Sequence, residues 1–364
     1  MEYEKLDELL QYLTESRIIP AISVAVGKQG EIVFSRAYGS VFETGTAITC
    51  ETRFDIASMT KILTGICFMR LVEQGYIGLY DPICNFFPEL NAQRPIERNG
   101  ETIGWCDASE VTWFHALTHT TGMGWTRPKT RPSLPNLGRG LQDIFDLPFA
   151  YVPGSRVLYS DLPIILMGVA MERVTGQPLD RLVEESLCEP LGLRHTGYRR
   201  ISRCLPDWGE TAPTEYDAVF RKRRIWGEVH DENASLLDGV AAHAGVFSTA
   251  NDMCELMMRY AASDGKDGLL KKTTVQQMAA EQAEEDGDRR GLIWKLSSPR
   301  EGAYTKSLSP GAYGHEGFTG CLGWNDPDKG LTVVLLSNDV YYGREARRLP
   351  QYRQQIMRAA VDGI

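Results

Sequence analysis

The sequence predicts an α/β protein in which one sheet is built from both ends of the chain and encloses a mostly helical insertion. Three features support this fold class: alternating apolar residues near the amino terminus, a second set of strand-like segments near the carboxyl terminus, and helical, loop-rich sequence between them. The 364 residues exceed the ~150 of a usual domain. We therefore expect a sheet domain from residues 1–80 and 235–364, and a helical domain from residues 81–234.

The chain opens with an amphipathic helix followed by a β-hairpin. One helical face carries four leucines, Leu6, Leu9, Leu10 and Leu13. Apolar and small residues then alternate over 22–26, glycines at 27 and 30 supply a turn, and 32–34 continue the apolar pattern. This pattern is typical of two paired strands.

Strand-like sequence returns only near the carboxyl end. The apolar stretches are Gly291–Leu296, Tyr313–Trp324 and Leu331–Ser337, with a turn expected over Asn325–Gly330 between the last two. A terminal helix is expected from about Arg344. The sheet is therefore expected to combine strands that lie about 300 residues apart in the sequence.

Composition excludes several classes of protein. The chain is 43% hydrophobic and 24% charged, as in ordinary globular proteins, and no apolar run approaches the ~20 residues of a membrane span. The net charge of 39 − 48 = −9 would repel a nucleic-acid backbone. We expect the basic run Arg221–Arg224 to be a surface turn and the charged run Glu281–Arg290 to be an exposed loop. No membrane and no nucleic-acid partner is expected.

The eight cysteines are scattered without a CxxC pair, so neither a zinc knuckle nor a dithiol redox site is indicated. We expect them to be reduced thiols in the core. The first 20 residues are acidic and amphipathic and lack the apolar centre of a signal peptide, which leads us to expect a cytoplasmic protein.

A serine and a lysine stand at an unusual place in the chain. A short strand from Phe54 leads into a helix that is apolar nearly all round and is therefore expected to be buried. Burial lowers the pKa of an unpaired lysine, which makes Lys61 a candidate base. Ser58 lies one helical turn earlier, as a serine nucleophile with a lysine base requires. The same SxxK spacing at Ser263 and Lys266 falls in a polar loop, and we interpret it as a coincidence.

Two further segments carry residues that could act together with Ser58 and Lys61. Tyr159 and Asp161 precede an apolar helical stretch, and taken alone they would be a rim residue and a helix N-cap. His315 lies in a glycine-rich strand segment, where glycine allows another backbone or a ligand to come close. Such a strand edge can offer a backbone N–H to an oxyanion.

In order and spacing, SxxK at 58–61, YxD at 159–161 and HxG at 315–317 resemble the serine β-lactamase and penicillin-binding-protein family. The similarity is to its class C β-lactamase, D,D-peptidase and esterase branch, and it spans roughly residues 20–340. Segments 227–234 and 242–245 further resemble the muramyl-peptide amidase-like and penicillin-binding-protein-4B-like subgroup. The resemblance implies a β-lactamase/transpeptidase-like fold, with an antiparallel sheet flanked by helices, a helical inserted domain and the active site between them.

The resemblance also implies roles for individual residues. Ser58 would be the acylated nucleophile, Lys61 its base, and Tyr159 the group that relays protons to the leaving group. Backbone N–H groups of Ser58 and of Phe318, which follows Gly317, would form the oxyanion hole.

The HxG motif places His315 where many lactamases carry lysine. It would either bind a substrate carboxylate or orient Tyr159.

Asp161 departs from the family pattern, which commonly has Asn or Ser there. A carboxylate cannot donate a hydrogen bond to a substrate carbonyl, and beside Lys61 it would raise the pKa of that lysine. Asp161 would therefore either point away as a helix cap or belong to a site tuned for a different substrate. We favour the second interpretation.

Metal and cofactor sites are not indicated. His115 and His119 are four residues apart, but no glutamate follows His115 directly and no third zinc ligand is obvious. The sequence also lacks a GxGxxG motif between a strand and a helix, and it lacks a P-loop. We expect no metal and no cofactor.

Together these observations predict a serine hydrolase that forms an acyl-enzyme on Ser58. Candidate substrates are small molecules or peptides with an amide or ester bond: D-amino-acid or muramyl peptides, carboxylic esters and β-lactams. The alternative is a non-catalytic ligand- or penicillin-binding protein on the same scaffold. Neither of these two functions predicts an oligomeric state.

Overall fold

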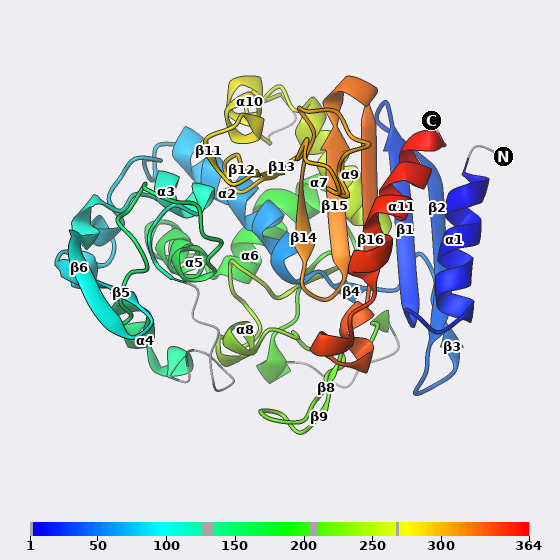
Figure 1. The fold of residues 1–364 in the computed structure, drawn as a ribbon, viewed down its shortest axis with the longest axis horizontal. Coiled ribbons are helices and arrows are strands. Elements are labelled where there is room, and N and C mark those ends of the chain that lie inside the picture. Colours follow the sequence, from blue (N-terminus) through cyan, green and yellow to red (C-terminus); the bar gives the residue numbers. More distant parts are fainter. Residues whose placement is uncertain (1–2, 125–133, 135, 204–209, 267–268, 364) are drawn as a thin grey trace.

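The computed structural model describes residues 3–124, 134, 136–203, 210–266 and 269–363. Its main element is a nine-stranded antiparallel sheet in the order β11-β12-β13-β14-β15-β16-β1-β2-β3 (Figure 1). The strands are, in chain order, β1 (Ala21–Lys28), β2 (Glu31–Val41), β3 (Thr46–Ala47), β11 (Ala283–Glu285), β12 (Asp288–Arg290), β13 (Lys295–Leu296), β14 (Tyr313–Gly317), β15 (Cys321–Asp326) and β16 (Leu331–Ser337). The predicted sheet with strands from both ends of the chain is confirmed.

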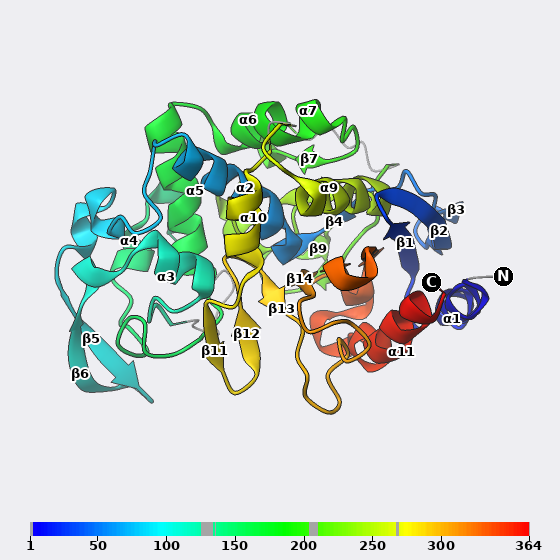
Figure 2. The same cartoon turned by 90° about the horizontal axis from the view of Figure 1, so that it is seen from above.

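Helices cover both faces of this sheet. The helices α1 (Glu4–Glu15) and α11 (Leu349–Asp362) lie side by side on one face, and α9 (Ala250–Ala262) lies on the other (Figure 2). Strand β16 contributes side chains to the packing on both faces of the sheet, because successive residues of a strand point to opposite faces. Leu335 packs toward α1 and α11, and Leu336 packs toward the core on the α9 side. An apolar strand in the middle of the sheet is thus buried on both faces.

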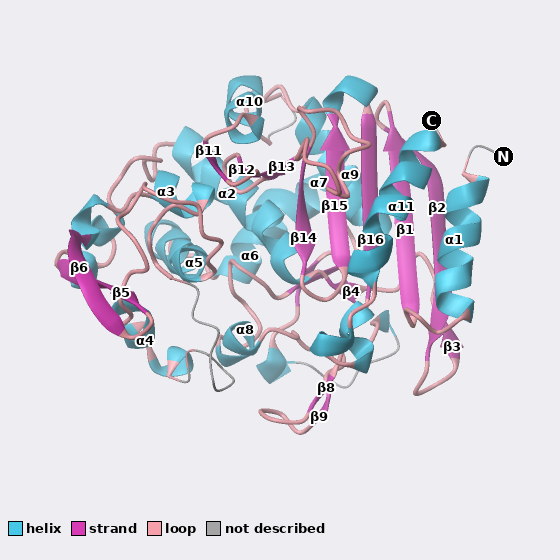
Figure 3. Cartoon of the chain, in the orientation of Figure 1, coloured by secondary structure: helices cyan, strands magenta, loops and turns pink. Residues whose placement is uncertain are grey.

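The helical part lies beside the sheet and carries small satellite sheets (Figure 3). Its helices are α3 (Trp113–Thr118), α4 (Gln142–Phe145), α5 (Leu162–Thr175), α6 (Leu179–Val183), α7 (Glu189–Leu191) and α8 (Glu232–Leu236). Its short strands are β5 (Gln93–Arg98), β6 (Glu101–Asp107), β7 (Gly197–Tyr198), β8 (Tyr216–Asp217) and β9 (Arg223–Arg224). The predicted domain boundaries at 80/81 and 234/235 stay a prediction.

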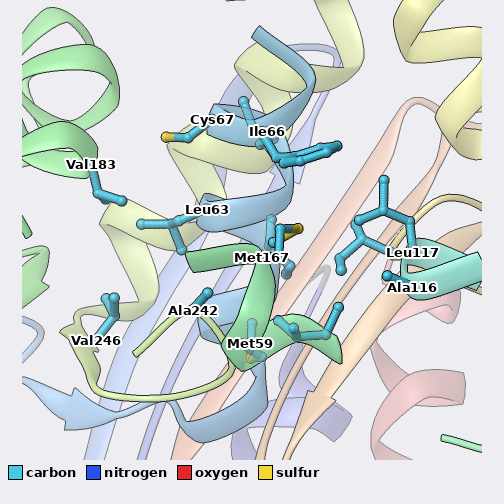
Figure 4. Packing of buried hydrophobic residues seen from close by; sticks show 14 of the residues in the cluster. Met59, Leu63, Ile66, Cys67, Ala116, Leu117, Met167, Val183, Ala242 and Val246 are labelled. Atoms are coloured by element: carbon cyan, nitrogen blue, oxygen red, sulfur yellow. The ribbon is translucent and has the colours of Figure 1, made fainter. Parts of the chain in front are cut away.

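Helix α2 (Thr60–Glu73) joins the two parts. As its sequence predicts, it is apolar nearly all round and buried over residues 60–69. Figure 4 shows Leu63, Ile66 and Cys67 of this helix among side chains of α3, α5 and α6, with Ala242 and Val246 near its start. Strands β4 (Phe54–Asp55) and β10 (Val246–Ser248) pair just before α2, and α10 (Lys272–Ala279) completes the helices.

Several local predictions need correction. Of the strand expected over Gly291–Leu296, only Lys295–Leu296 is a strand, and the basic run expected to be a surface turn contains β9 and the largely buried side chain of Arg221. The stretch Tyr313–Trp324 is two strands, because Gly320 has a φ of +112° and turns the chain back. Strand β15 extends to Asp326, so the following turn is shorter than expected. Residues Arg344–Ala346 form a 3₁₀ turn, and the terminal helix begins only at Leu349. The charged run Glu281–Arg290 is not a loop, because it contains the edge hairpin β11–β12.

The cysteines agree with the sequence. Seven cysteines are free, five of them buried, while Cys204 lies outside the described residues. In the part of the chain that the structure describes, no helix has the length and apolar character needed to cross a bilayer. Cytoplasmic residence stays a prediction.

The two-faced burial of β16 leads to a stability prediction. We expect Leu335→Ala to lower the free energy of unfolding by about 2–5 kcal/mol, because it leaves a cavity beneath α1 and α11. Val33→Ala is the control: Val33 also lies in the sheet, on β2, but its side chain is 45% exposed. Chemical denaturation measures both, and equal effects of the two substitutions would contradict this account of the core.

Candidate active site

Ser58 lies in a tight turn at the entrance to α2. The turn is the 3₁₀ segment Ala57–Met59, which follows β4 directly. Ala57 has a φ of +47°, in the left-handed region that a residue with a Cβ rarely adopts. The buried carboxylate of Asp55 holds this turn by accepting the Ala57 N–H at 2.8 Å. A strained backbone held by its surroundings is typical of functional sites.

Lys61 lies one turn along the helix and is fully buried. Its Nζ is 3.0 Å from Ser58 Oγ and 3.0 Å from the carbonyl oxygen of His243. The third contact is with Asp161 Oδ1, at 2.7 Å. The buried ammonium therefore has two hydrogen-bond acceptors and, in Asp161, a counter-charge.

This pairing corrects the predicted pKa of Lys61. Burial lowers the pKa of the ammonium, but the Asp161 carboxylate and Tyr159 raise it more, so the pKa lies above that of an ordinary lysine. The helix pattern alone treats Lys61 as unpaired and predicts a lowered pKa. The other expectation, that Asp161 beside Lys61 would raise the pKa of the lysine, has the direction that the structure gives.

Tyr159 completes the hydrogen bonds at Ser58. Its phenolic O–H donates to Ser58 Oγ at 2.8 Å, and its ring lies 5.0 Å from Lys61 Nζ. Burial and the nearby Asp161 raise the pKa of Tyr159, so the phenol is neutral at rest. The serine oxygen therefore accepts from both Lys61 and Tyr159. The structure brings together three residues that the sequence singled out from two separate motifs.

Asp161 does not act as a helix cap. It precedes α5 by one residue, but its side chain makes no capping hydrogen bond. Ser160 Oγ instead accepts the N–H of Leu162, at 3.3 Å. Of the two predicted alternatives, the one that turns the Asp161 carboxylate away from Lys61 is wrong.

His315 enters the site from β14. Its Nδ1 lies 2.8 Å from the backbone oxygen of Glu316, so we assign the ring proton to Nδ1. Burial and the nearby Lys61 lower the pKa of His315 to about 3, so the imidazole is neutral. Its Nε2 is buried and has no partner among the described residues. A neutral ring with a free lone pair is suited to accept a hydrogen bond and is a poor ligand for a carboxylate.

The end of β14 presses against the turn that holds Ser58. A Cβ added to Gly317 would lie 2.4 Å from the backbone oxygen of Ile56, so only glycine fits there. Next to it, the Thr319 hydroxyl donates to the backbone oxygen of Asp55 at 2.7 Å. The main chain of Phe318 is thereby held beside the Ser58 turn. The approach of another backbone, predicted from the strand glycines, is observed.

Sequence reasoning missed the support behind this site. The His243 ring lies 2.9 Å from Asp231, a contact that fixes the segment whose carbonyl binds Lys61. Asp55 also accepts the backbone N–H of His230 at 2.6 Å. The resemblance of segments 227–234 and 242–245 to a family subgroup was the one sequence feature that pointed to these residues. It did not indicate that they would lie behind Lys61 and support it.

A cavity of about 340 Å³ opens in front of Ser58. Basic side chains outnumber acidic ones on its walls, which are formed by Ser58, Tyr159, Arg290, Lys295, His315, Glu316, Gly317, Phe318, Arg347, Pro350 and Arg353. Arg290 was also missed, because it lies in the charged run interpreted as a loop. As the last residue of β12 it is only 7% exposed.

The two histidines considered as zinc ligands have other contacts. His115 Nδ1 accepts the N–H of Thr112 in a capping box at the start of α3. The His119 ring packs on Tyr159 with 4.6 Å between ring centroids, and burial lowers the pKa of His119 well below its usual value. Within the described ranges, no three His, Cys, Asp or Glu side chains gather as a metal site would require.

Known proteins are similar to this chain over most of its length. A profile of the β-lactamase family matches residues 6–358. A protein of Escherichia coli (strain K12) named "Putative D-alanyl-D-alanine carboxypeptidase" is 30% identical over 372 residues, covering 92% of this chain and 82% of its own. A Salmonella typhi protein of the same name is 30% identical over 354 residues, covering 88% of this chain and 78% of its own. The chain belongs to the β-lactamase family, and the predicted resemblance is confirmed.

Solved structures show the same fold. EstCE1, described as a hydrolase with promiscuous acyltransferase activity, superposes with a TM-score of 0.77 at 21% identity over 98% of each chain. A penicillin-binding protein homologue from Caulobacter crescentus gives 0.75 at 18% identity, over 100% of this chain and 98% of its own. The predicted β-lactamase/transpeptidase-like fold is confirmed, and family and relatives together support a hydrolase.

The Lys61–Asp161 pair leads to a prediction about proton affinity. We expect Asp161→Asn to lower the pKa of Lys61 below the ordinary value of about 10.4, because burial remains while the neighbouring charge is lost. A pH titration of labelled lysine side chains by NMR measures this. Asp264→Asn, which removes the partner of the exposed Lys266, should leave the Lys61 signal unchanged. An unshifted Lys61 in Asp161→Asn would contradict the pairing.

The close approach of Gly317 leads to a second prediction. Gly317→Ala should destabilise the protein by about 1–3 kcal/mol, because its Cβ would collide with backbone rather than with a flexible side chain. Gly311→Ala is the matched control, since nothing lies within 4 Å of a Cβ placed there. Thermal unfolding compares the two variants, and similar melting temperatures would show that the Ser58 turn is not held by this contact.

Proposed function

We propose that this protein is a serine hydrolase that cleaves an amide or ester through an acyl-enzyme on Ser58. The observation that carries the proposal is the pair of hydrogen bonds to Ser58 Oγ, from Lys61 at 3.0 Å and from Tyr159 at 2.8 Å. A serine needs an adjacent proton acceptor to become a nucleophile and a proton donor for the departing group. Both are present in one buried cluster.

The resting contacts support one route for the protons. Lys61 is charged at rest, so it accepts the hydroxyl proton of Ser58 only after giving up one of its own, and the acceptor within reach is Asp161 Oδ1, at 2.7 Å. This first transfer is uphill, because the ion pair raises the pKa of Lys61. The serine oxygen then attacks the substrate carbonyl carbon. In this scheme Asp161 is the first proton acceptor, a role that the Asn or Ser common in the family does not fill.

The later steps return these protons. Backbone N–H groups of Ser58 and Phe318 stabilise the negative oxygen of the tetrahedral intermediate. The Tyr159 O–H protonates the leaving nitrogen or oxygen as the scissile bond breaks, and the phenolate regains a proton from Lys61. Lys61 then takes back its proton from Asp161. In deacylation the same groups take one proton from the attacking water and deliver it to Ser58 Oγ, and the other proton of the water leaves with the carboxylic acid.

Arg290 supports a substrate with a carboxylate next to the scissile bond. Its guanidinium lies 5.7 Å from the Tyr159 ring centroid and lines the cavity in front of Ser58. One nitrogen pairs with Asp288 at 2.8 Å, and the buried Nε has no partner among the described residues. Because His315 is neutral, we assign carboxylate recognition to Arg290. A peptide that ends in a D-amino acid, as the names of the relatives suggest, meets this requirement.

Covalent labelling tests the proposal. We expect a fluorophosphonate to add once, at Ser58, and to fail in Ser58→Ala, whose turnover of any ester substrate should fall by at least about 10³-fold. Lys61→Ala should slow the labelling strongly. Intact-protein mass and peptide mapping give the result.

The matched control is Ser263→Ala, which removes the serine of the second SxxK sequence and should be labelled normally at Ser58. Absence of an adduct on the folded wild-type protein would overturn the hydrolase and favour a non-catalytic binding protein.

A further inference from the structure

The cavity has a second basic wall that the proposed reaction does not use. This wall is formed by Lys295 of β13, Arg353 of α11 and Arg347, which lies between the 3₁₀ turn Arg344–Ala346 and α11. It lies next to Phe318, whereas Arg290 lies over Tyr159. The cavity thus has a basic group at each of two sites around Ser58.

Two of these cations share one carboxylate. Glu316 lies 2.8 Å from Lys295 Nζ and also pairs with Arg353, while the Tyr304 hydroxyl donates to it at 2.6 Å. Burial raises the pKa of Glu316, but the two cations lower it more, so the carboxylate stays charged. One negative charge therefore faces two positive charges. Arg353 also has a buried Nε without a partner among the described residues.

Arg347 is held in place without an acidic partner. Its guanidinium lies 4.1 Å from the Phe318 ring centroid and donates to the backbone oxygens of Phe318 at 3.3 Å and Arg344 at 3.1 Å. Among the residues that the structure describes, no carboxylate forms an ion pair with it. The Asp339 carboxylate instead accepts the backbone N–H groups of Arg348 and Leu349, at 2.9 and 3.0 Å.

Arg347 is a positioned cation: Asp339 and Glu345 act on it only at longer range, and neither forms an ion pair with it among the described residues, so its guanidinium can still accept a bound anion. Two backbone carbonyls and an aromatic face orient Arg347, so little side-chain entropy remains to be lost when an anion arrives. Arginine also binds carboxylates through two parallel hydrogen bonds.

We propose that Arg347, supported by Arg353, forms a second anion subsite, and that the substrate carries a second carboxylate besides the one assigned to Arg290. This inference rests on the proposed function and deepens it by naming the substrate as a dicarboxylate. The subsite adjoins Phe318, so the second carboxylate lies near the oxyanion side of Ser58. Glu316 holds Lys295 and Arg353 in position but contributes no free charge.

Binding to Ser58→Ala tests the subsite without depending on turnover. The probes are two D-aminoacyl peptides that differ only in a second side-chain carboxylate, one of them carrying the matching carboxamide. Calorimetry should show the dicarboxylate binding at least about tenfold more tightly, as one charge-assisted contact is worth ~1.5–3 kcal/mol. Adding Arg347→Gln should remove this preference, and Arg347→Lys should restore part of it.

Arg348→Gln is the matched control. Arg348 is the next residue in the chain but lines a different hollow together with Arg17 and Tyr352. It should leave the preference intact. Equal binding of both peptides to Ser58→Ala, or an unchanged preference in Arg347→Gln with an unchanged melting temperature, would overturn the second subsite.

The outcomes separate this inference from the proposed function. A Ser58 adduct without a carboxylate preference would leave the hydrolase standing and remove the subsite. A carboxylate preference without an adduct would keep the subsite and turn the protein into a binder of dicarboxylates.

Discussion

Burying the ammonium of Lys61 requires a counter-charge, and much of the site follows from how the chain supplies it. The effective penalty for burying an unpaired charge is several kcal/mol, and losing one partner of a buried pair typically costs 3–5 kcal/mol. The partner, Asp161, stands at the start of α5, so the ion pair joins α5 to α2. The same contact brings Tyr159, two residues earlier, to the serine oxygen. One electrostatic requirement therefore fixes both the packing of two helices and the protons available to Ser58.

Local patterns in the sequence were sufficient where a single segment decides the structure. The hairpin β1–β2, the strand Leu331–Ser337 and the buried helix after Ser58 follow from side-chain periodicity within a dozen residues. The three-residue spacing of Ser58 and Lys61 predicts their contact, although Ser58 lies in the 3₁₀ turn that precedes the helix. Turn and helix boundaries were less accurate, since the left-handed conformation at Gly320 and the late start of α11 depend on tertiary neighbours.

Contacts between segments that lie far apart in the sequence could not be predicted. The carbonyl of His243 meets Lys61 across 182 residues, and nothing in either segment specifies the other. Arg290 sits in a run of charges that resembles solvent-exposed sequence, and only the pairing of β12 with its neighbours buries it. The resemblance to a known family placed Tyr159 and His315 at the site. It also gave Asp161 beside Lys61, with a raised pKa of the lysine, as one of two alternatives, and only the structure decides between this arrangement and a helix cap.

The walls of the cavity differ in mechanical stiffness. Strand β14 is hydrogen-bonded within a sheet that continues to β11 on one side and β3 on the other, so His315 and Gly317 can shift only if several strands shift with them. The opposite wall consists of side chains on α11 and the turn before it, whose positions depend on individual hydrogen bonds and ion pairs and not on a strand ladder. Single substitutions on the arginine side could therefore alter which ligands are bound, while the geometry at Ser58 stays constant.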